Sequence, residues 1–486
     1  MRSLSLASVS FSYNAARAVL SDVDLELGVG WHGLVGANGS GKTTLLRVIS
    51  GELEPNSGTV MRPDPVIRCD QVVDTPSAEV AAFAASWEPA AYTLRGRMEI
   101  EPEMLDRWST LSPGERRRWQ VAAALVADPA VLALDEPTNH LDAESSQLLV
   151  AALERFRGIG ILVSHDRDLL DQLTTDTIMV ADGRVRHWDA SYTTARLEWE
   201  RSLQQARSDL DAATRDARKL ARRLADEQRA ADLKIAQWKR SQRYARPGDH
   251  DTTSAVRTRK FRLGEAAAGK RISAVRDQAR RAEDARGRLA VQRDHRGPIS
   301  FTGSTAPRRV LVECRGPLTA GERVLADHID VTIERDTRLG IAGRNGAGKT
   351  TLLRHLRQRW DLPAEQLLFL PQDLSFAESE EALAGIVVRS ADRLGQTMQL
   401  FARLGGEPDD VLASDHPSPG ELRKLLLADA LVRSVWCMML DEPTNHLDLD
   451  TVEALEAAIA DYPGALVVVS HDARFTAAVT NTRLEL

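Results

Sequence analysis

The residues best suited to chemistry lie in one octapeptide that occurs twice. Asp-Glu-Pro-Thr-Asn-His-Leu-Asp begins at Asp135 and again at Asp441, each time directly after an apolar run. A carboxylate at the end of a buried strand can hold a magnesium ion through water, and the glutamate that follows, Glu136 or Glu442, can polarise an attacking water as a general base. The octapeptide therefore predicts two sites that hydrolyse a nucleoside triphosphate.

Each octapeptide has a phosphate-binding loop upstream. Both loops match G-x-x-x-x-G-K-[ST] between a predicted strand and a predicted helix. In such a loop glycines let backbone amides face phosphate oxygens, the helix N-terminus adds positive potential, lysine neutralises charge, and the first threonine reaches magnesium. The predicted ATP-binding residues are Gly36, Asn38, Gly39, Gly41, Lys42, Thr43 and Thr44 in the first loop and Gly343, Asn345, Gly346, Gly348, Lys349, Thr350 and Thr351 in the second.

Spacing shows that the two halves repeat one another. Asp135 precedes His165 by 30 residues, and Asp441 precedes His471 by the same 30. Each histidine stands in Val-Ser-His-Asp after an apolar run, which places it to contact the γ-phosphate. A single histidine would more often be structural, but an interval kept in both halves favours a catalytic role. Self-similarity of this kind predicts two homologous modules.

Bulk composition limits the class of protein. A chain of 486 residues with 43% hydrophobic and 27% charged residues is expected to form two or three globular domains. Its three cysteines are far apart, which argues against a disulfide framework or a zinc site and favours a reducing cytoplasm. The start of the chain lacks the pattern of a signal peptide, and no run of about 18 apolar residues occurs. We expect a cytoplasmic protein that does not insert into a membrane.

The middle of the chain has a different pattern. Residues 196–300 contain 27 Lys+Arg and 15 Asp+Glu, although the whole chain has a net charge of -7. A basic segment between acidic modules suggests binding to a polyanion. Apolar residues at heptad spacing predict two antiparallel helices that reverse at 246–249 and project from the modules. These residues are Leu203, Leu210, Ala217, Leu224, Ala231 and Trp238, then Ile272, Val275, Ala279, Ala282 and Leu289.

The predicted tip of this hairpin mixes cations with aromatic rings. That composition suits phosphate contacts and base stacking, although a charged tip that is merely solvated is a real alternative. The residues predicted to bind RNA are Trp238, Lys239, Arg240, Arg243, Tyr244, Arg246, Arg257, Arg259, Lys260 and Arg262.

Two further segments have nearly the same sequence, Leu-Ser-Pro-Gly-Glu at 111–115 and Pro-Ser-Pro-Gly-Glu at 417–421. With the loops and the histidines they resemble the signature sequences of ATP-binding cassette ATPases. The resemblance implies an α/β fold with two P-loop cassette domains, each with a mixed or parallel sheet and a helical subdomain, which close head to tail within one monomer. It adds to the ATP-binding residues Tyr13, Gln71, Ser112, Gly114, Gln372, Ser418 and Gly420, and it makes Thr43, Gln71, Asp135, Thr350, Gln372 and Asp441 the metal residues.

In that family an aromatic ring upstream of the first glycine loop stacks on adenine, and the resemblance implies this role for Tyr13. The register that aligns Val19 with Val324 puts Leu318 opposite Tyr13, so the second site is expected to lack the ring.

Two cassettes without membrane spans, Asn-His in both octapeptides and a charged two-helix linker resemble the ABC-F family. This resemblance implies domains at 1–190, 191–300 and 301–486, with ATP and Mg²⁺ as cofactors. Its implied partners are ribosomal RNA and peptidyl-tRNA on the ribosome, where such proteins act on translation or displace antibiotics. Gln71 to Ser112 spans 41 residues, too few for the added arm that some members carry.

Two rival functions remain open at this point. The chain could be the ATPase subunit of a drug exporter whose membrane partner is a separate protein, but a long basic hairpin has little use there. It could also be a DNA-associated cassette ATPase, although the zinc motifs of one such group are absent.

Overall fold

Contacts divide the chain into two compact units, Met1–Ala195 with His295–Leu486, and Arg196–Asp294. Within the first unit we call residues 3–195 module one and residues 306–486 module two. The domain limits expected from the sequence, 1–190, 191–300 and 301–486, stay a prediction. The computed structural model describes residues 3–14, 18–70, 75–139, 141–243, 252–288, 306–321, 323–372, 374, 376–414, 417–445 and 447–486.

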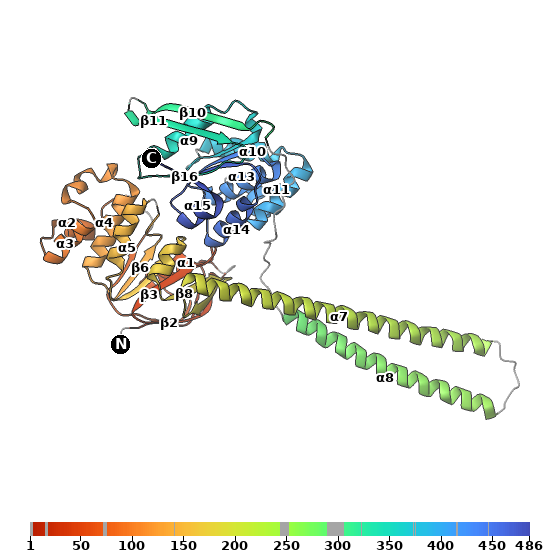
Figure 1. Ribbon diagram of the computed structural model, residues 1–486. Helices are drawn as coiled ribbons and strands as arrows, with labels where there is room; N and C mark the ends of the chain where they lie inside the picture. The colour runs from red at the N-terminus through yellow and green to blue at the C-terminus, as the bar shows by residue number, and fades with distance from the viewer. Residues whose placement is uncertain are drawn as a thin grey trace. The chain divides into compact units, whose positions relative to one another are not determined.

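Module one is built on a six-stranded sheet in the order β5-β6-β7-β3-β8-β9 (Figure 1). All neighbours are parallel except β8 and β9. Its central strands are apolar runs buried on both faces, as parallel strands between helices must be. The strands are β3 (Gly30–Val35), β5 (Val66–Cys69), β6 (Val131–Asp135), β7 (Ile159–Val163), β8 (Asp176–Ala181) and β9 (Arg184–Trp188).

A second, antiparallel sheet of module one has the order β2-β1-β4. Its strands are β1 (Leu4–Phe11), β2 (Leu20–Leu27) and β4 (Ser57–Met61). The helices of the module are α1 (Lys42–Ser50), α2 (Ala78–Ala85), α3 (Pro89–Arg97), η1 (Pro102–Thr110), α4 (Pro113–Val126), α5 (Ala143–Leu153) and α6 (Arg167–Leu173).

Module two repeats this plan with a parallel sheet in the order β13-β14-β15-β12-β16 and a hairpin of β10 and β11. The strands are β10 (Val310–Ala320), β11 (Arg323–Glu334), β12 (Arg338–Ala342), β13 (Leu367–Leu370), β14 (Cys437–Asp441), β15 (Ala465–Val469) and β16 (Thr482–Glu485). The helices are α9 (Lys349–Gln358), η2 (Ala364–Gln366), α10 (Phe376–Val387), α11 (Ala391–Arg403), α12 (Pro408–Ala413), α13 (Pro419–Arg433), α14 (Leu449–Ala460) and α15 (Ala473–Val479).

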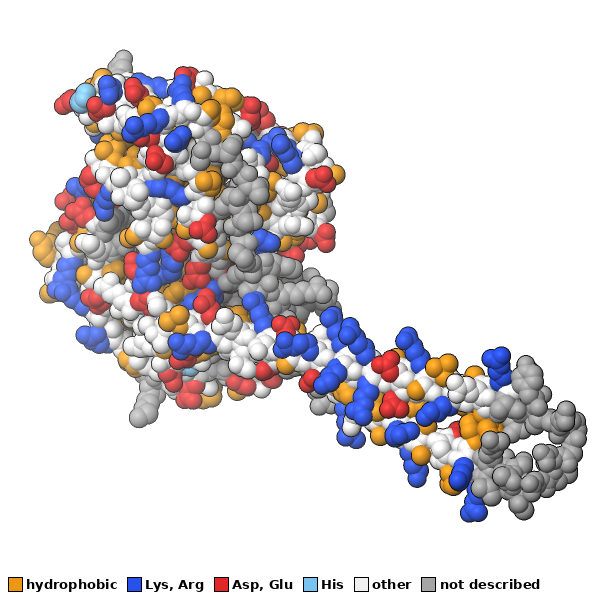
Figure 2. All heavy atoms as spheres, turned by 45° about the vertical axis from the view of Figure 1, so that its right-hand side comes forward, with side chains coloured by type: hydrophobic (Ala, Val, Ile, Leu, Met, Phe, Trp, Pro, Cys, Tyr) orange, Lys and Arg blue, Asp and Glu red, His pale blue; other side chains and the backbone are white. Residues whose placement is uncertain are grey.

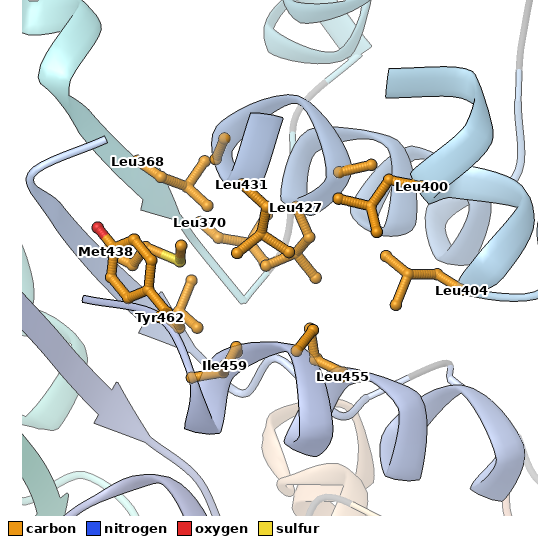
Figure 3. Packing of buried hydrophobic residues seen from close by; sticks show 14 of the residues in the cluster. Leu368, Leu370, Leu400, Leu404, Leu427, Leu431, Met438, Leu455, Ile459 and Tyr462 are labelled. Carbon is orange, nitrogen blue, oxygen red and sulfur yellow. The ribbon is translucent and has the colours of Figure 1, made fainter. Parts of the chain in front are cut away.

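In the core of module two, helices α13 and α14 pack against the parallel sheet. Figure 3 shows Leu427 and Leu431 of α13 beside Leu370 of β13, with Leu455 of α14 facing them. All four leucines are buried almost completely. Burying a leucine side chain stabilises a fold by roughly 1.5–3 kcal/mol, so this cluster holds α13 and α14 against the sheet.

The second unit is the predicted helical hairpin. Its helices are α7 (Tyr192–Arg243), whose first turn belongs to module one, and α8 (Thr252–Arg288). Ala217 and Val275, both predicted for the apolar seam, are buried. Near the far end Trp238 stacks on Phe261 with ring centroids 4.4 Å apart. The two aromatic rings therefore pack on one another, which uses one face of Trp238.

Among the described helices, none combines the length and the apolar character needed to cross a bilayer.

Candidate functional site

The first phosphate loop joins the end of β3 to the start of α1. Gly36, Gly39 and Gly41 all have positive φ, and a Cβ added to Gly36 would lie 2.4 Å from the carbonyl oxygen of Val180. Lys42 begins the helix, and its Nζ donates to the carbonyl oxygen of Gly36 at 2.8 Å. The loop is therefore a concave backbone turn with its lysine folded across it, the shape that holds a phosphate chain.

The second loop has the same geometry between β12 and α9. Gly343, Gly346 and Gly348 have positive φ, and Lys349 Nζ donates to the carbonyl oxygen of Gly343 at 2.7 Å. A Cβ on Gly343 would lie 2.6 Å from the carbonyl oxygen of Leu486. The repeat in the sequence is thus a repeat of backbone conformation.

The sheet register brings the acids to the loops. Strands β3, β6 and β7 run parallel, so Asp135 lies opposite Val163 at the same edge as the end of β3. Thr43 Oγ1 donates to Asp135 Oδ2 at 3.2 Å, and Thr350 hydrogen-bonds to Asp441. A hydroxyl and a carboxylate held together are oxygen ligands that magnesium prefers. Asp441 Oδ2 is buried without a hydrogen-bond partner, so these donors fit a cation.

The two glutamates are buried directly behind these acids, each beside its histidine. The His165 backbone N–H donates to Glu136 Oε2 at 3.2 Å, and the equivalent His471 to Glu442 distance is also 3.2 Å. His165 Nε2 lies 3.3 Å from the other oxygen of Glu136, and His471 Nε2 lies 3.4 Å from that of Glu442. Each glutamate and histidine therefore form one unit in both modules.

Burial controls the protonation of this unit. Burial, with the nearby charge of Asp135, raises the pKa of Glu136 to about 8, and burial raises the pKa of Glu442 to about 8. Burial, reinforced by the charge of Lys42, lowers the pKa of His165 to about 4. A carboxyl group whose pKa is near the working pH is well suited to act as a general base. The neutral histidine can accept or donate one hydrogen bond.

Each signature segment starts a helix with a capping box. Ser112 accepts from the Glu115 N–H, and Glu115 Oε2 accepts from the Ser112 N–H at 2.8 Å. Ser418 and Glu421 repeat the box at the start of α13. A capped N-terminus leaves positive potential at the helix end, which suits an anionic phosphate.

A buried arginine near the start of each signature helix, α4 or α13, makes contacts that the sequence analysis did not predict. Arg117 donates to the backbone carbonyl of Asp135, and Arg423 donates to the backbone carbonyls of Glu442 and Gln372. These contacts tie the signature helix to the acidic strand end of its own module. Both arginines stand three residues after the signature glycine, and this repeated spacing could have indicated their role from the sequence.

The last residue of each octapeptide also has a function that the sequence prediction did not assign. Asp448 Oδ2 accepts from the backbone N–H of Asn38 at 3.0 Å, and Asp142 Oδ2 accepts from that of Asn345 at 3.3 Å. Each aspartate thus contacts the phosphate loop of the other module. Because Asp142 and Asp448 also cap helices α5 and α14, they connect each module to its partner site.

A cavity of about 730 Å³ lies between the modules at the second phosphate loop. Its lining from module two includes Lys349, Gln372 and Glu442, and module one contributes Ser112. The expected head-to-tail pairing is therefore present in the geometry of this site. The volume falls within the range of small-molecule and cofactor pockets.

Ion pairs continue the contact between the modules near the start of α7. Arg167 donates through both terminal nitrogens to the carboxylate of Glu456. Arg474 donates to Asp168 and, at 2.8 Å, to Asp171. The Tyr192 hydroxyl donates to Glu453 Oε1 at 2.9 Å. The first turn of α7, which belongs to module one, is therefore bonded directly to module two.

The remaining predicted site residues have varied placements. Tyr13 is 59% exposed, and its hydroxyl lies 3.2 Å from Thr44 Oγ1, whereas Leu318 is buried in the core of module two. Gly114 is buried, and Ser418 and Gly420 lie at the start of α13. Gln71, Tyr244 and Arg246 lie outside the described residues, as do the side chains of Arg243 and Arg257. Lys239, Arg240, Arg259, Lys260 and Arg262 are exposed on the hairpin, and Figure 2 shows cations along its length.

Comparison with known proteins identifies the repeat. The family model described as ABC transporter matches residues 20–139 and again 326–445. The chain is 32% identical to the tylosin resistance ATP-binding protein TlrC of Streptomyces fradiae, over 99% of this chain and 97% of that protein.

Two other relatives and a solved structure extend this result. The ribosome protection protein VmlR of Bacillus subtilis is 29% identical over 93% of this chain and 81% of its own length. The energy-dependent translational throttle protein EttA of Mycobacterium tuberculosis is 27% identical over 94% of this chain and 87% of its own. A solved structure of RNase-L Inhibitor shares the fold, with a TM-score of 0.61 and 18% identity over 98% of this chain and 87% of that one.

Proposed function

Because the chain belongs to the ABC-F family of ATP-binding cassette proteins, we propose that it binds the ribosome and acts on translation. As a member of this family it binds ATP and is an ATPase, which converts ATP and water to ADP and phosphate. Relatives are named for ribosome protection, for control of translation and for tylosin resistance. These names support a role in translation, including protection of the ribosome from antibiotics.

The reciprocal aspartate contacts carry the mechanistic part of this proposal. Asp448 bonds the first phosphate loop and Asp142 bonds the second, so each module contributes to the site of the other. A triphosphate in either site would be held by its loop lysine and capped by the signature helix of the partner module, Ser418 for the first site and Ser112 for the second. Nucleotide binding therefore favours closure of the modules.

Hydrolysis in each site is assigned to the buried glutamate. Glu136 and Glu442 orient and deprotonate the attacking water, while His165 and His471 position the glutamate and contact the γ-phosphate. Mg²⁺ would be held by Thr43, Asp135 and Gln71 in the first site and by Thr350, Asp441 and Gln372 in the second. When bound, it neutralises charge on the phosphate oxygens. After hydrolysis the capping contact is lost, and the modules can separate.

The helical hairpin is assigned to RNA. Along one face of α7, a hollow of about 720 Å³ is lined by five cations and by two acids, Asp226 and Glu227; the cations are Arg215, Arg218, Lys219, Arg222 and Arg223. Cations in a row suit the phosphates of folded RNA, whose contacts are dominated by backbone charge. We assign this face and the described tip residues to ribosomal RNA, with peptidyl-tRNA as the ligand nearest the tip. Such a partner places the protein in the cytoplasm.

A sedimentation experiment tests the proposal. The double variant Glu136→Gln/Glu442→Gln should bind ATP without hydrolysing it and should therefore pellet with ribosomes when ATP is present. The matched control Lys42→Ala/Lys349→Ala loses the phosphate contacts and should stay in the supernatant under the same conditions. If the glutamine variant is inactive as an ATPase, binds ATP and still remains entirely free of ribosomes, the proposal is wrong.

A further inference from the structure

The two nucleotide sites differ where the base of the nucleotide must lie. In the first site Tyr13 follows β1, packs edge-on against Phe11 with centroids 5.0 Å apart, and is 59% exposed as a residue. Its hydroxyl lies next to Thr44, at the start of the helix that holds the phosphates. The ring is therefore a free face beside the phosphate loop, available to stack on a purine.

The second site cannot offer the same face. Leu318, which the register of Val19 with Val324 puts opposite Tyr13, is fully buried among the core residues of module two. Its Cδ2 lies 3.1 Å from the position that a Cβ on Gly348 would occupy, so its side chain packs directly against the phosphate loop. No Phe, Tyr or Trp is among the described residues that line the cavity of this site.

The hairpin of β10 and β11 brings a different side chain to this place. In module one the described pairing of β1 with β2 includes Phe11 with Leu20, and in module two the ladder of β10 and β11 includes Ala320 with Arg323. Gly321, the residue that follows β10, has a φ of +60°. Arg323 therefore stands at the rim of the second site.

Arg323 lines the cavity together with Ala320 and Leu325, the latter adjacent to Gly348 of the phosphate loop. Its side chain is exposed, and its guanidinium has no hydrogen bond or ion pair with any described residue. A guanidinium is a planar cation that stacks on aromatic rings and donates hydrogen bonds along its edge. A purine that stacked on the guanidinium plane would also lie near these two apolar neighbours.

We propose that Arg323 holds the purine base of the nucleotide in the second site, taking the part that the Tyr13 ring takes in the first. This rests on the proposed function, since it requires ATP in the second site. The two sites then recognise the base by different chemistry, an aromatic ring in one and a planar cation in the other.

The test isolates each site in the full chain. Lys42→Ala/Glu442→Gln leaves only the second site able to bind and prevents its hydrolysis, and Lys349→Ala/Glu136→Gln does the same for the first. Calorimetric titration with MgATP and with magnesium tripolyphosphate, which has no base, then separates base contacts from phosphate contacts. In the second-site background Arg323→Ala should weaken ATP about tenfold, a loss of about 1.4 kcal/mol, and leave tripolyphosphate unchanged.

Three controls make the result specific. Arg323→Tyr should restore ATP affinity to within about threefold, because a ring also stacks, whereas Arg323→Lys should not, because it lacks the plane. Tyr13→Ala should weaken ATP only in the first-site background. Equal ATP affinity with and without Arg323, or equal weakening of ATP and tripolyphosphate, overturns the inference. Failure of both unmodified backgrounds to bind any ATP would instead refute the proposed function.

Discussion

Glu136 and Glu442 are carboxyl groups buried at the two sites, where burial disfavours their charged form. Each is about 5–6% exposed, and each has a pKa raised to about 8. The unfolded chain ionises these groups near their ordinary pKa, whereas the folded chain keeps the proton. Between the ordinary pKa and about pH 8, the folded state therefore loses stability relative to the unfolded state as pH rises.

Replacing the two buried acids should therefore raise the thermal stability of the protein by an amount that depends on pH. Without nucleotide, Glu136→Gln/Glu442→Gln should have a melting temperature higher than the parent by about 5 °C near pH 7.5, because glutamine has no proton to lose. The difference should shrink towards zero below about pH 4.5, where the glutamates are protonated in both states. Differential scanning fluorimetry across pH measures it. A constant difference at all pH values contradicts the assignment of the shift to burial of charge.

The phosphate loops make a second prediction at the residue scale. Gly36→Ala would put a Cβ 2.4 Å from the Val180 carbonyl oxygen, in a backbone conformation with φ of +153°. We expect the loop to distort and ATP affinity at the first site to fall at least about tenfold. Gly39→Ala is the matched control, because a Cβ there meets no atom within 4 Å although its φ is also positive. Calorimetry with ATP in the first-site background measures both, and equal losses would implicate backbone strain alone.

At the scale of elements, the hairpin of α7 and α8 is a thin structure with a small apolar seam. Val275 is 6% exposed and Ala217 is 7% exposed, whereas most of their neighbours in sequence are exposed. Pairing of such helices rests on a few buried contacts, because the polar faces gain little from one another. The seam is therefore the point at which the hairpin can be opened without touching the ATP sites.

Val275→Asp should separate the two helices. Burying an unpaired carboxylate costs several kcal/mol, more than the contacts of one valine supply. We expect lower helix content by circular dichroism and loss of ribosome pelleting, with ATP binding in both sites retained. Arg276→Ala, one residue further along the exposed face, is the control and should change neither quantity. Retention of ribosome binding by the aspartate variant would remove the hairpin from the proposed interface.

At the scale of the whole described chain, ion pairs couple module one to module two. Arg167 and Glu456 form a two-pronged pair whose side chains are 10% and 16% exposed, better shielded than an ordinary surface pair. Arg474 reaches Asp171 and the Thr193 hydroxyl in the first turn of α7. A relative movement of the modules must therefore act on that turn.

A double-mutant cycle tests this coupling. Arg167→Met and Glu456→Gln should each lower the rate of ATP hydrolysis about three- to tenfold, because closure of the modules is weakened. The double variant should be no slower than the slower single variant, which corresponds to a coupling of about 1 kcal/mol. Arg184→Met, at an exposed position on β9, should leave the rate unchanged. Additive losses would mean that the two residues act separately.

Much of the molecule was determined by the sequence itself. The octapeptides, glycine loops and 30-residue intervals predicted two like modules, and the family matches and the shared fold confirm the tandem cassettes. The heptad positions Ala217 and Val275 were correctly predicted to be buried. These features are local or periodic, and their physical cause, backbone conformation or one-sided burial, acts over a few residues.

Other features required the tertiary structure. Asp448 contacts Asn38 and Arg167 pairs with Glu456, although these residues are remote in sequence. Arg323 reaches the second site through the hairpin of β10 and β11. No local pattern encodes such contacts, because they depend on how the strands register and how the two modules face one another. The sequence predicted that the second site lacks a tyrosine, and only the tertiary structure shows that Arg323 lines the cavity there.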